Sequence, residues 1–108
     1  MLKLGNITLD VPFYQAPLSG YTDRAMRVLA HEYGAPLAYT GVILAKIALH
    51  KKAFNRLYFQ PRTDEGLVGA QILGGDPETM AKAAAAFSNV GFDLIDLNFA
   101  CPAPKVLR

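Results

Sequence analysis

The feature that most constrains the fold is a regular alternation between short apolar runs and stretches with helical periodicity. Strand-like runs lie at residues 13–18, 36–40, 67–72 and 93–99, and helix-like stretches at 23–33, 45–57 and 77–89, after a hairpin over residues 2–11 that turns at Gly5-Asn6. Strands that alternate with helices pair in parallel, because each helix carries the chain back to the start of the next strand. The sequence therefore predicts an α/β fold with four parallel strands.

The predicted helices end at residues that favour helix ends. Thr22 precedes the first helix as a capping residue, and Gly34 follows it, where a left-handed backbone is common. Asp76 can cap the helix that begins at residue 77, and Pro77 fits its first turn, where no backbone N–H is needed. These residues mark the loops between strands and helices.

Two architectures have this order of elements, a doubly wound sheet and a β/α barrel. A doubly wound sheet usually carries a G-x-G-x-x-G phosphate loop after its first strand. The first strand here is followed by SGYTD (19–23), and LGGDPE (73–78) lacks that glycine spacing. The barrel is therefore favoured. A complete TIM-type barrel has eight strands in about 250 residues, so these 108 residues are expected to form about half a barrel, with no second domain.

Composition favours a globular chain in a reducing compartment. Hydrophobic residues make up 52% and charged residues 19%, which excludes a disordered, highly charged segment. A single cysteine cannot form an internal disulfide bond. No signal peptide is visible at the amino terminus, and no apolar run approaches the roughly 20 residues that span a bilayer. The chain is expected to be soluble and cytoplasmic, without a membrane partner.

The charges are unevenly distributed along the chain, although the net charge is only +2. No acidic residue occurs between Glu32 and Asp64. That interval contains Lys46, His50, Lys51, Lys52, Arg56 and Arg62. Such a segment can attract a polyanion such as RNA, or it can be the solvated face of an ordinary protein. Charge alone leaves both interpretations open.

Polar residues stand at the carboxyl ends of the last two predicted strands, where barrel enzymes have their active sites. Side chains alternate along a strand, so Asp96 and Asn98 share the face toward the barrel interior, as does Gln71 on the preceding strand. Carboxamides can both donate and accept, which suits the edge of a flavin or a nucleobase. They can equally satisfy buried backbone groups. For Asp96 a structural role is favoured, since a buried carboxylate is costly unless it is paired.

The only cysteine, Cys101, follows the last strand on a loop with prolines at 102 and 104. A free cysteine is commonly an inert core residue, but this position favours exposure toward the barrel mouth. His31 and His50 are distant in sequence, so a nucleophilic thiolate has no evident local base. With a pKa near 8.5 a thiol is mostly protonated at pH 7, so it could act as a general acid. The residues alone permit each of these roles.

Three segments together resemble the dihydrouridine synthase family of flavin enzymes. QAPLSGYTDRAMR (15–27) is similar to the amino-terminal flavin segment A-P-M-x-G-x-T-D-x-x-F-R. GAQILGGDPETMAKAA (69–84) is similar to the Q-L/I-x-G motif and the helix after it. DLNFACPAPKV (96–106) resembles the signature D-x-N-x-G-C-P-x-x-K-V. Their order and spacing also match, and the resemblance covers nearly the whole chain.

The resemblance implies the amino-terminal portion of a β/α-barrel catalytic domain that uses FMN to reduce the C5–C6 double bond of uridine in tRNA. NADPH or NADH reduces the flavin, which passes a hydride to C6. By position, Cys101 would be the proton donor to C5, Asn98 a hydrogen-bond partner of the uracil and Lys105 a further substrate contact. Gln71 would bind the isoalloxazine edge, and the backbone at Ala16, Pro17 and Leu18 would line the flavin. No metal ligand is expected.

The sequence also departs from the family pattern. Leu18 stands for the usual Met, Met26 for Phe, Ala100 for Gly, and Gly41 for an acidic residue. Strands five to eight, the phosphate-binding segment and the helical tRNA-binding domain are not among these 108 residues, so the chain alone is expected to be inactive. Two alternatives stay open: a non-catalytic half-barrel that covers its sheet edges by self-association, and another FMN-dependent barrel oxidoreductase.

Overall fold

The computed structural model describes residues 1–55 and 60–102. It begins with an antiparallel hairpin of β1 (Leu2–Leu4) and β2 (Ile7–Leu9), in which Leu2 pairs with Leu9. Gly5 takes a left-handed backbone with φ 59° in the turn between them, a conformation that costs glycine little. The predicted hairpin is confirmed.

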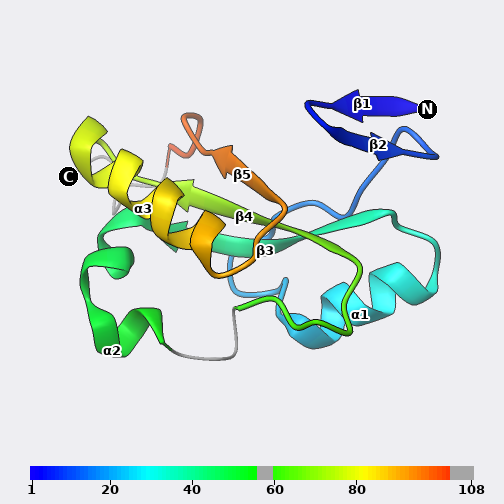
Figure 1. Ribbon diagram of the computed structural model, residues 1–108, viewed down its shortest axis with the longest axis horizontal. Coiled ribbons are helices and arrows are strands. Elements are labelled where there is room, and N and C mark those ends of the chain that lie inside the picture. The colour runs from blue at the N-terminus through cyan, green and yellow to red at the C-terminus, as the bar shows by residue number, and fades with distance from the viewer. Residues whose placement is uncertain (56–59, 103–108) are drawn as a thin grey trace.

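The main sheet has three parallel strands in the order β3–β4–β5, with β3 at Leu37–Leu44, β4 at Leu67–Leu73 and β5 at Leu94–Leu97. Figure 1 shows them side by side, with the hairpin beyond one end of the sheet. Because the strands are parallel, their carboxyl ends lie together at one end of the sheet, at Leu44, Leu73 and Leu97. Gln71 and Asn98, two of the residues that the sequence singles out, lie near these carboxyl ends.

The prediction of four parallel strands is wrong for the described residues. Segment 13–18 makes only one isolated parallel bridge, between Gln15 and Ala38, with a hydrogen bond of 3.0 Å from the Gln15 N–H to the Leu37 carbonyl. Pro12 and Pro17 flank that bridge. Proline has no N–H to donate to a ladder, so the segment touches the edge of β3 without becoming a strand.

The helices differ from their predicted bounds in detail. Helix α1 (Arg24–Glu32) is capped by Asp23, whose carboxylate accepts from the Met26 N–H at 2.9 Å, and not by Thr22. The Thr22 hydroxyl instead bonds the backbone of Leu18, with which it makes two contacts of 3.0 and 3.1 Å. Helix α3 (Pro77–Asn89) begins as predicted, since Asp76 caps it by accepting from the Thr79 N–H at 2.7 Å.

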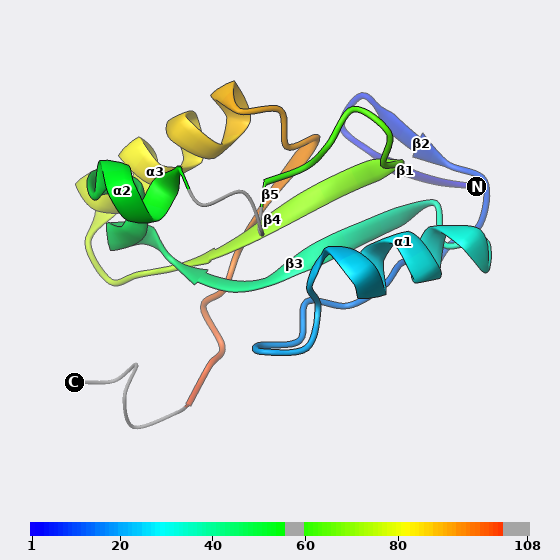
Figure 2. The ribbon, with the colours of Figure 1, turned by 90° about the horizontal axis from the view of Figure 1, so that it is seen from below.

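The single helix predicted over 45–57 is replaced by a 3₁₀ helix, η1 (Ala45–Leu49), and a short α2 (Lys51–Phe54). His50 separates them with an extended backbone, φ −108° and ψ 96°. Residues 56 and 57 of the predicted helix lie outside the described residues. Both views place α2 and α3 together, away from the hairpin (Figures 1 and 2).

The sheet packs on both faces. On one face Val68, Ala70 and Ile72 of β4 meet α3 through buried residues that include Met80, Ala83 and Phe87. On the other face Leu37 and Tyr39 meet Leu9 of the hairpin, with Leu67 and Leu94 packed around them. The second cluster lies at the starts of the three strands, so the hairpin covers the amino-terminal end of the sheet. The carboxyl end is left for polar residues.

Candidate active site

Polar side chains of β4 and β5 meet at the carboxyl ends of the strands. Gln71 pairs with Asp96 in the ladder, and the two side chains project to the same face because parallel pairing keeps register. Gln71 Nε2 donates to Asp96 Oδ2 at 2.6 Å, and Asn98 Nδ2 donates to Gln71 Oε1 at 3.0 Å. The predicted neighbourhood of Gln71, Asp96 and Asn98 is confirmed. Asp96 is paired, as a partly buried carboxylate requires.

Cys101 is attached to this group through its backbone. Asn98 Oδ1 accepts from the Ala100 and Cys101 N–H groups, each at 3.1 Å, and the Asn98 N–H donates to the Ile72 carbonyl at 2.9 Å. The thiol is free and partly exposed, so Cys101 is not a core residue. Lys105 and Pro104 lie outside the described residues.

The segment with Ala16, Pro17 and Leu18 passes close to the middle of β3. A Cβ atom on Gly41 would lie 3.2 Å from the Leu18 carbonyl and 3.5 Å from the Gly20 N. A glycine at position 41 therefore lets the loop approach β3. Ala16 and Leu18 are exposed and Pro17 is partly buried. The Leu18 backbone is already hydrogen-bonded to Tyr21 and Thr22, and no described contact joins the three residues to Gln71 or Asn98.

Tyr39 lies beneath the polar group and was not singled out from the sequence. Its ring packs over Gly69, where an added Cβ would come within 2.5 Å of Tyr39 Cε1. The ring centroid of Tyr14 is 5.4 Å away. Burial, the charge of Asp96 and the neighbouring Tyr14 all raise the pKa of Tyr39. The phenol therefore stays protonated, and Tyr39 is a neutral side chain packed beneath Asp96 and Gln71.

Arg27 and Glu65 form an ion pair that sequence reasoning also missed. Arg27 Nε donates to Glu65 Oε1 at 2.9 Å, and Arg27 Nη2 to Glu65 Oε2 at 3.2 Å. Both side chains are fully buried, and Arg27 Nη1 has no partner among the described residues. The only signal was the place of Arg27 in the motif over 15–27. The pair ties α1 to the loop before β4.

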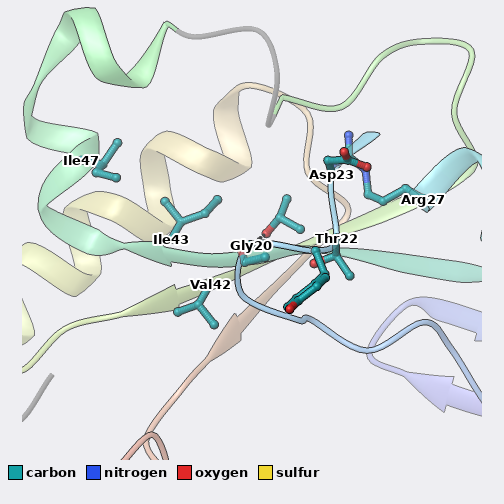
Figure 3. A pocket seen from close by; sticks show the side chains of 10 residues that line it. Gly20, Thr22, Asp23, Arg27, Val42, Ile43 and Ile47 are labelled. Carbon is teal, nitrogen blue, oxygen red and sulfur yellow. Dashed lines mark hydrogen bonds between the residues drawn. The ribbon is translucent and has the colours of Figure 1, made fainter. Parts of the chain in front are cut away.

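Arg27 also lines a cavity of about 280 Å³ between the start of α1, β3 and η1. Figure 3 shows Asp23 and Arg27 at one side and Ile43 and Ile47 at the other. None of the site residues predicted from the sequence is among its described lining residues. The polar group at the strand ends does not line the cavity, although the Gln71 N–H donates to the hydroxyl of Thr40, a lining residue, at 3.3 Å.

The polar group at the strand ends, formed by Gln71, Asp96 and Asn98, keeps hydrogen-bonding positions that its internal bonds do not use. Asn98 Oδ1 is fully used, whereas Gln71 retains one N–H and one lone pair, and Asn98 retains one N–H. These free positions match ring carbonyls and ring N–H groups. Among residues 1–55 and 60–102, no three His, Cys, Asp or Glu side chains come together as metal ligands. No helix in the described part of the chain is long and apolar enough to cross a membrane.

Comparison with known proteins assigns the chain to a family. The family model described as dihydrouridine synthase matches residues 14–108. The tRNA-dihydrouridine synthase B of Vibrio cholerae is 37% identical over 105 residues, which are 97% of this chain and 33% of the relative. The Escherichia coli protein of the same name is 34% identical over 107 residues, or 99% of this chain and 33% of the relative. No solved structure matches the chain.

The chain thus spans about a third of the length of the curated relatives it matches. The matched segment contains every predicted site residue from Ala16 to Lys105, together with the polar group at the strand ends. Both the family model and the relatives point to the same conclusion. This chain belongs to the dihydrouridine synthase family.

Proposed function

We propose that this chain is the amino-terminal part of the TIM-barrel catalytic domain of an FMN-dependent tRNA-dihydrouridine synthase. The reaction is reduction of the C5–C6 double bond of a uridine in tRNA. One observation carries the proposal: Gln71, Asn98 and Cys101 are joined by hydrogen bonds at the carboxyl ends of parallel strands. The names of the relatives, which include tRNA-dihydrouridine synthase B, support the substrate class.

The residues present fit FMN as a cofactor. Gln71 would hold the isoalloxazine edge with its remaining N–H and lone pair, and the backbone of Ala16, Pro17 and Leu18 would lie along the ring. Bound FMN, reduced by NADPH or NADH, supplies the hydride that C6 receives. The role of this chain is to hold the ring and the uracil together and to provide the proton.

Asn98 and Cys101 act on the uracil. Asn98 would donate its free Nδ2–H to a uracil carbonyl, which orients the base. The S–H bond of Cys101 breaks as a C–H bond forms at C5, and the resulting thiolate recovers a proton from water. A thiol is a suitable acid because it is mostly protonated at neutral pH. Lys105 would contact the substrate as well.

The tRNA would contact a basic segment, formed by η1 and α2, beside the carboxyl ends of the strands. η1 begins directly after β3 ends, and Lys46, Lys51 and Lys52 are all exposed on η1 and α2. None of these three lysines has a carboxylate partner among the described residues. Unpaired cations beside a site for uridine are suited to the phosphates that flank it.

The isolated 108 residues are proposed to be inactive, because a TIM barrel needs eight strands to close around its ligand. The test therefore uses residues 1–108 followed by the remaining two thirds of a synthase. The remaining two thirds are the natural continuation of the chain where the gene encodes one, and are otherwise taken from the Vibrio cholerae relative. This protein is called the complete enzyme below.

Replacing Cys101 with Ala in the complete enzyme tests the proposal. Loss of a general acid is expected to lower the rate of dihydrouridine formation by about 10² to 10⁴-fold, with tRNA affinity unchanged. The measurement is single-turnover reduction of unmodified tRNA by the prereduced enzyme. Unchanged turnover would refute the assignment of Cys101. An enzyme that reduces a small molecule but no tRNA uridine would be another FMN-dependent oxidoreductase.

A further inference from the structure

Asp96 is the one member of the polar group to which the proposed reaction gives no task. It lies on β5 opposite Gln71, half-buried, with Tyr39 beneath. Its bond to Gln71, at 2.6 Å, is the shortest in the group. We propose that Asp96 is a positioning residue, which fixes the orientation of two carboxamides in series and thereby holds the backbone of Cys101 in place. The proposal rests on the proposed function for its catalytic meaning.

The first step is the orientation of Gln71. An ionised carboxylate only accepts hydrogen bonds, so the side of Gln71 that faces Asp96 must be its NH₂ group. The Gln71 oxygen is then directed to the other side, where it accepts from Asn98 Nδ2. A flipped Gln71 would set its oxygen against the carboxylate and its NH₂ against that of Asn98. Asp96 thus makes one of two otherwise similar orientations strongly preferred.

The second step carries this orientation to the loop. Because Asn98 gives its NH₂ to Gln71, its oxygen faces the loop, where it accepts from the Ala100 and Cys101 N–H groups. A flipped Asn98 would direct an NH₂ at two other donors and lose both bonds. In the series Asp96, Gln71, Asn98 and the loop N–H groups, the carboxylate at one end accepts and the loop N–H groups at the other end donate, so both ends favour the same orientation of the two carboxamides.

The same series determines what the site presents to its ligands. With Asp96 ionised, Gln71 and Asn98 each retain one free N–H, and Asn98 retains no lone pair. Without the negative charge, the loop N–H groups alone orient the carboxamides, and a turned Gln71 would present an oxygen where an N–H is needed. Loss of the charge should affect both the place of the thiol and the recognition of ring carbonyls.

The substitution Asp96→Asn in the complete enzyme tests the proposal, because it keeps the shape and removes the charge. The Cys101 N–H, observed by NMR with ¹⁵N-labelled cysteine, is expected to exchange with solvent roughly three- to tenfold faster, the ratio that corresponds to one ordinary hydrogen bond. Single-turnover reduction should fall by roughly 10- to 100-fold, the range caused by small misplacement of a reacting group.

Asp93→Asn is the matched control. Asp93 is a carboxylate three residues earlier, and its Oδ2 accepts from the Val68 N–H at 2.8 Å, outside the series. This variant can lose stability but should leave exchange at Cys101 and single-turnover rate per folded enzyme unchanged. Should Asp96→Asn fail to fold, Gln71→Met interrupts the same series and should release the Cys101 N–H in the same way.

The outcomes separate this inference from the proposed function. Unaltered exchange at Cys101 in Asp96→Asn, or equal acceleration in Asp93→Asn, would overturn the positioning role while leaving the result for Cys101→Ala untouched. Full turnover in Cys101→Ala would overturn the proposed acid, whereas the exchange measurement would still report whether Asp96 holds the loop.

Discussion

At the scale of single residues, the buried pair of Arg27 and Glu65 connects two parts of the chain that are 38 positions apart. Removal of one partner leaves a charge in the interior without compensation, which typically costs about 3 to 5 kcal/mol. Here the charge left without compensation would be that of Arg27, whose Nη1 already lacks a partner among the described residues. Glu65→Ala should therefore lower the free energy of unfolding by about 3 to 5 kcal/mol, measured by urea titration of the complete enzyme.

Asp64→Ala provides the control for that prediction. Desolvation acts to raise the pKa of Asp64, but hydrogen bonds and the charges of Arg62 and Arg24 outweigh it and lower the pKa. These ion pairs are exposed, with N–O distances of 3.3 Å, and exposed pairs contribute little. Asp64→Ala should leave the urea midpoint nearly unchanged. Equal destabilisation by the two variants would contradict the special role of burial.

At the scale of elements, Gly69 shows why β4 has a glycine in its middle. An added Cβ would come within 2.5 to 2.9 Å of three Tyr39 ring atoms, and Tyr39 is only 3% exposed. The ring is held between the hairpin and the sheet, so it has little room to move. Gly69→Ala should destabilise the protein by about 1 to 3 kcal/mol, the usual cost of overpacking, as measured by thermal and urea unfolding.

Gly75→Ala is the matched control for Gly69→Ala, because nothing lies within 4 Å of a Cβ at that position and its backbone is unstrained. It should be neutral or slightly stabilising, since alanine restricts the unfolded chain. If Gly69→Ala proved equally harmless, the Tyr39 ring would have room to move, and it would not be fixed beneath the polar group.

The elements also show how far sequence patterns reach. Apolar periodicity and capping residues predicted α3 and β4 closely, because local signals and tertiary packing agree there. They failed at 13–18, where Pro12 and Pro17 prevent a ladder although the run is apolar. The alternation of side chains along the strands predicted that Gln71, Asp96 and Asn98 share one face. It did not predict the direction of their hydrogen bonds. The sequence could not predict the partner of Arg27, because only tertiary contacts bring Glu65 to α1.

At the scale of the whole molecule, three exposed lysines, Lys46, Lys51 and Lys52, lie at the opposite end of the main sheet from the hairpin. The hairpin and its Lys3 lie beyond the amino-terminal end of the main sheet, whereas η1 and α2, with their unpaired lysines, follow its carboxyl end. The proposed site for uridine is at the carboxyl end of the strands. A polyanion that reaches this site should therefore contact Lys51 and Lys52 but not Lys3. Arg56, which belongs to the same basic interval, lies outside the described residues.

Two single substitutions, Lys51→Ala and Lys52→Ala, test this arrangement against Lys3→Ala, which removes the same single charge from an exposed position on the hairpin. Each lost phosphate contact reduces the slope of log affinity against log salt by roughly 0.7 to 0.9. Fluorescence anisotropy of labelled tRNA with the complete enzyme, over a series of salt concentrations, should show weaker binding and a shallower slope for Lys51→Ala and Lys52→Ala but not for Lys3→Ala. Equal losses in all three variants would mean that net charge, and not the segment beside the carboxyl ends of the strands, attracts the tRNA. An unchanged slope in Lys51→Ala and Lys52→Ala would place the phosphates elsewhere, because a contact that releases no counterions is not a contact with phosphate.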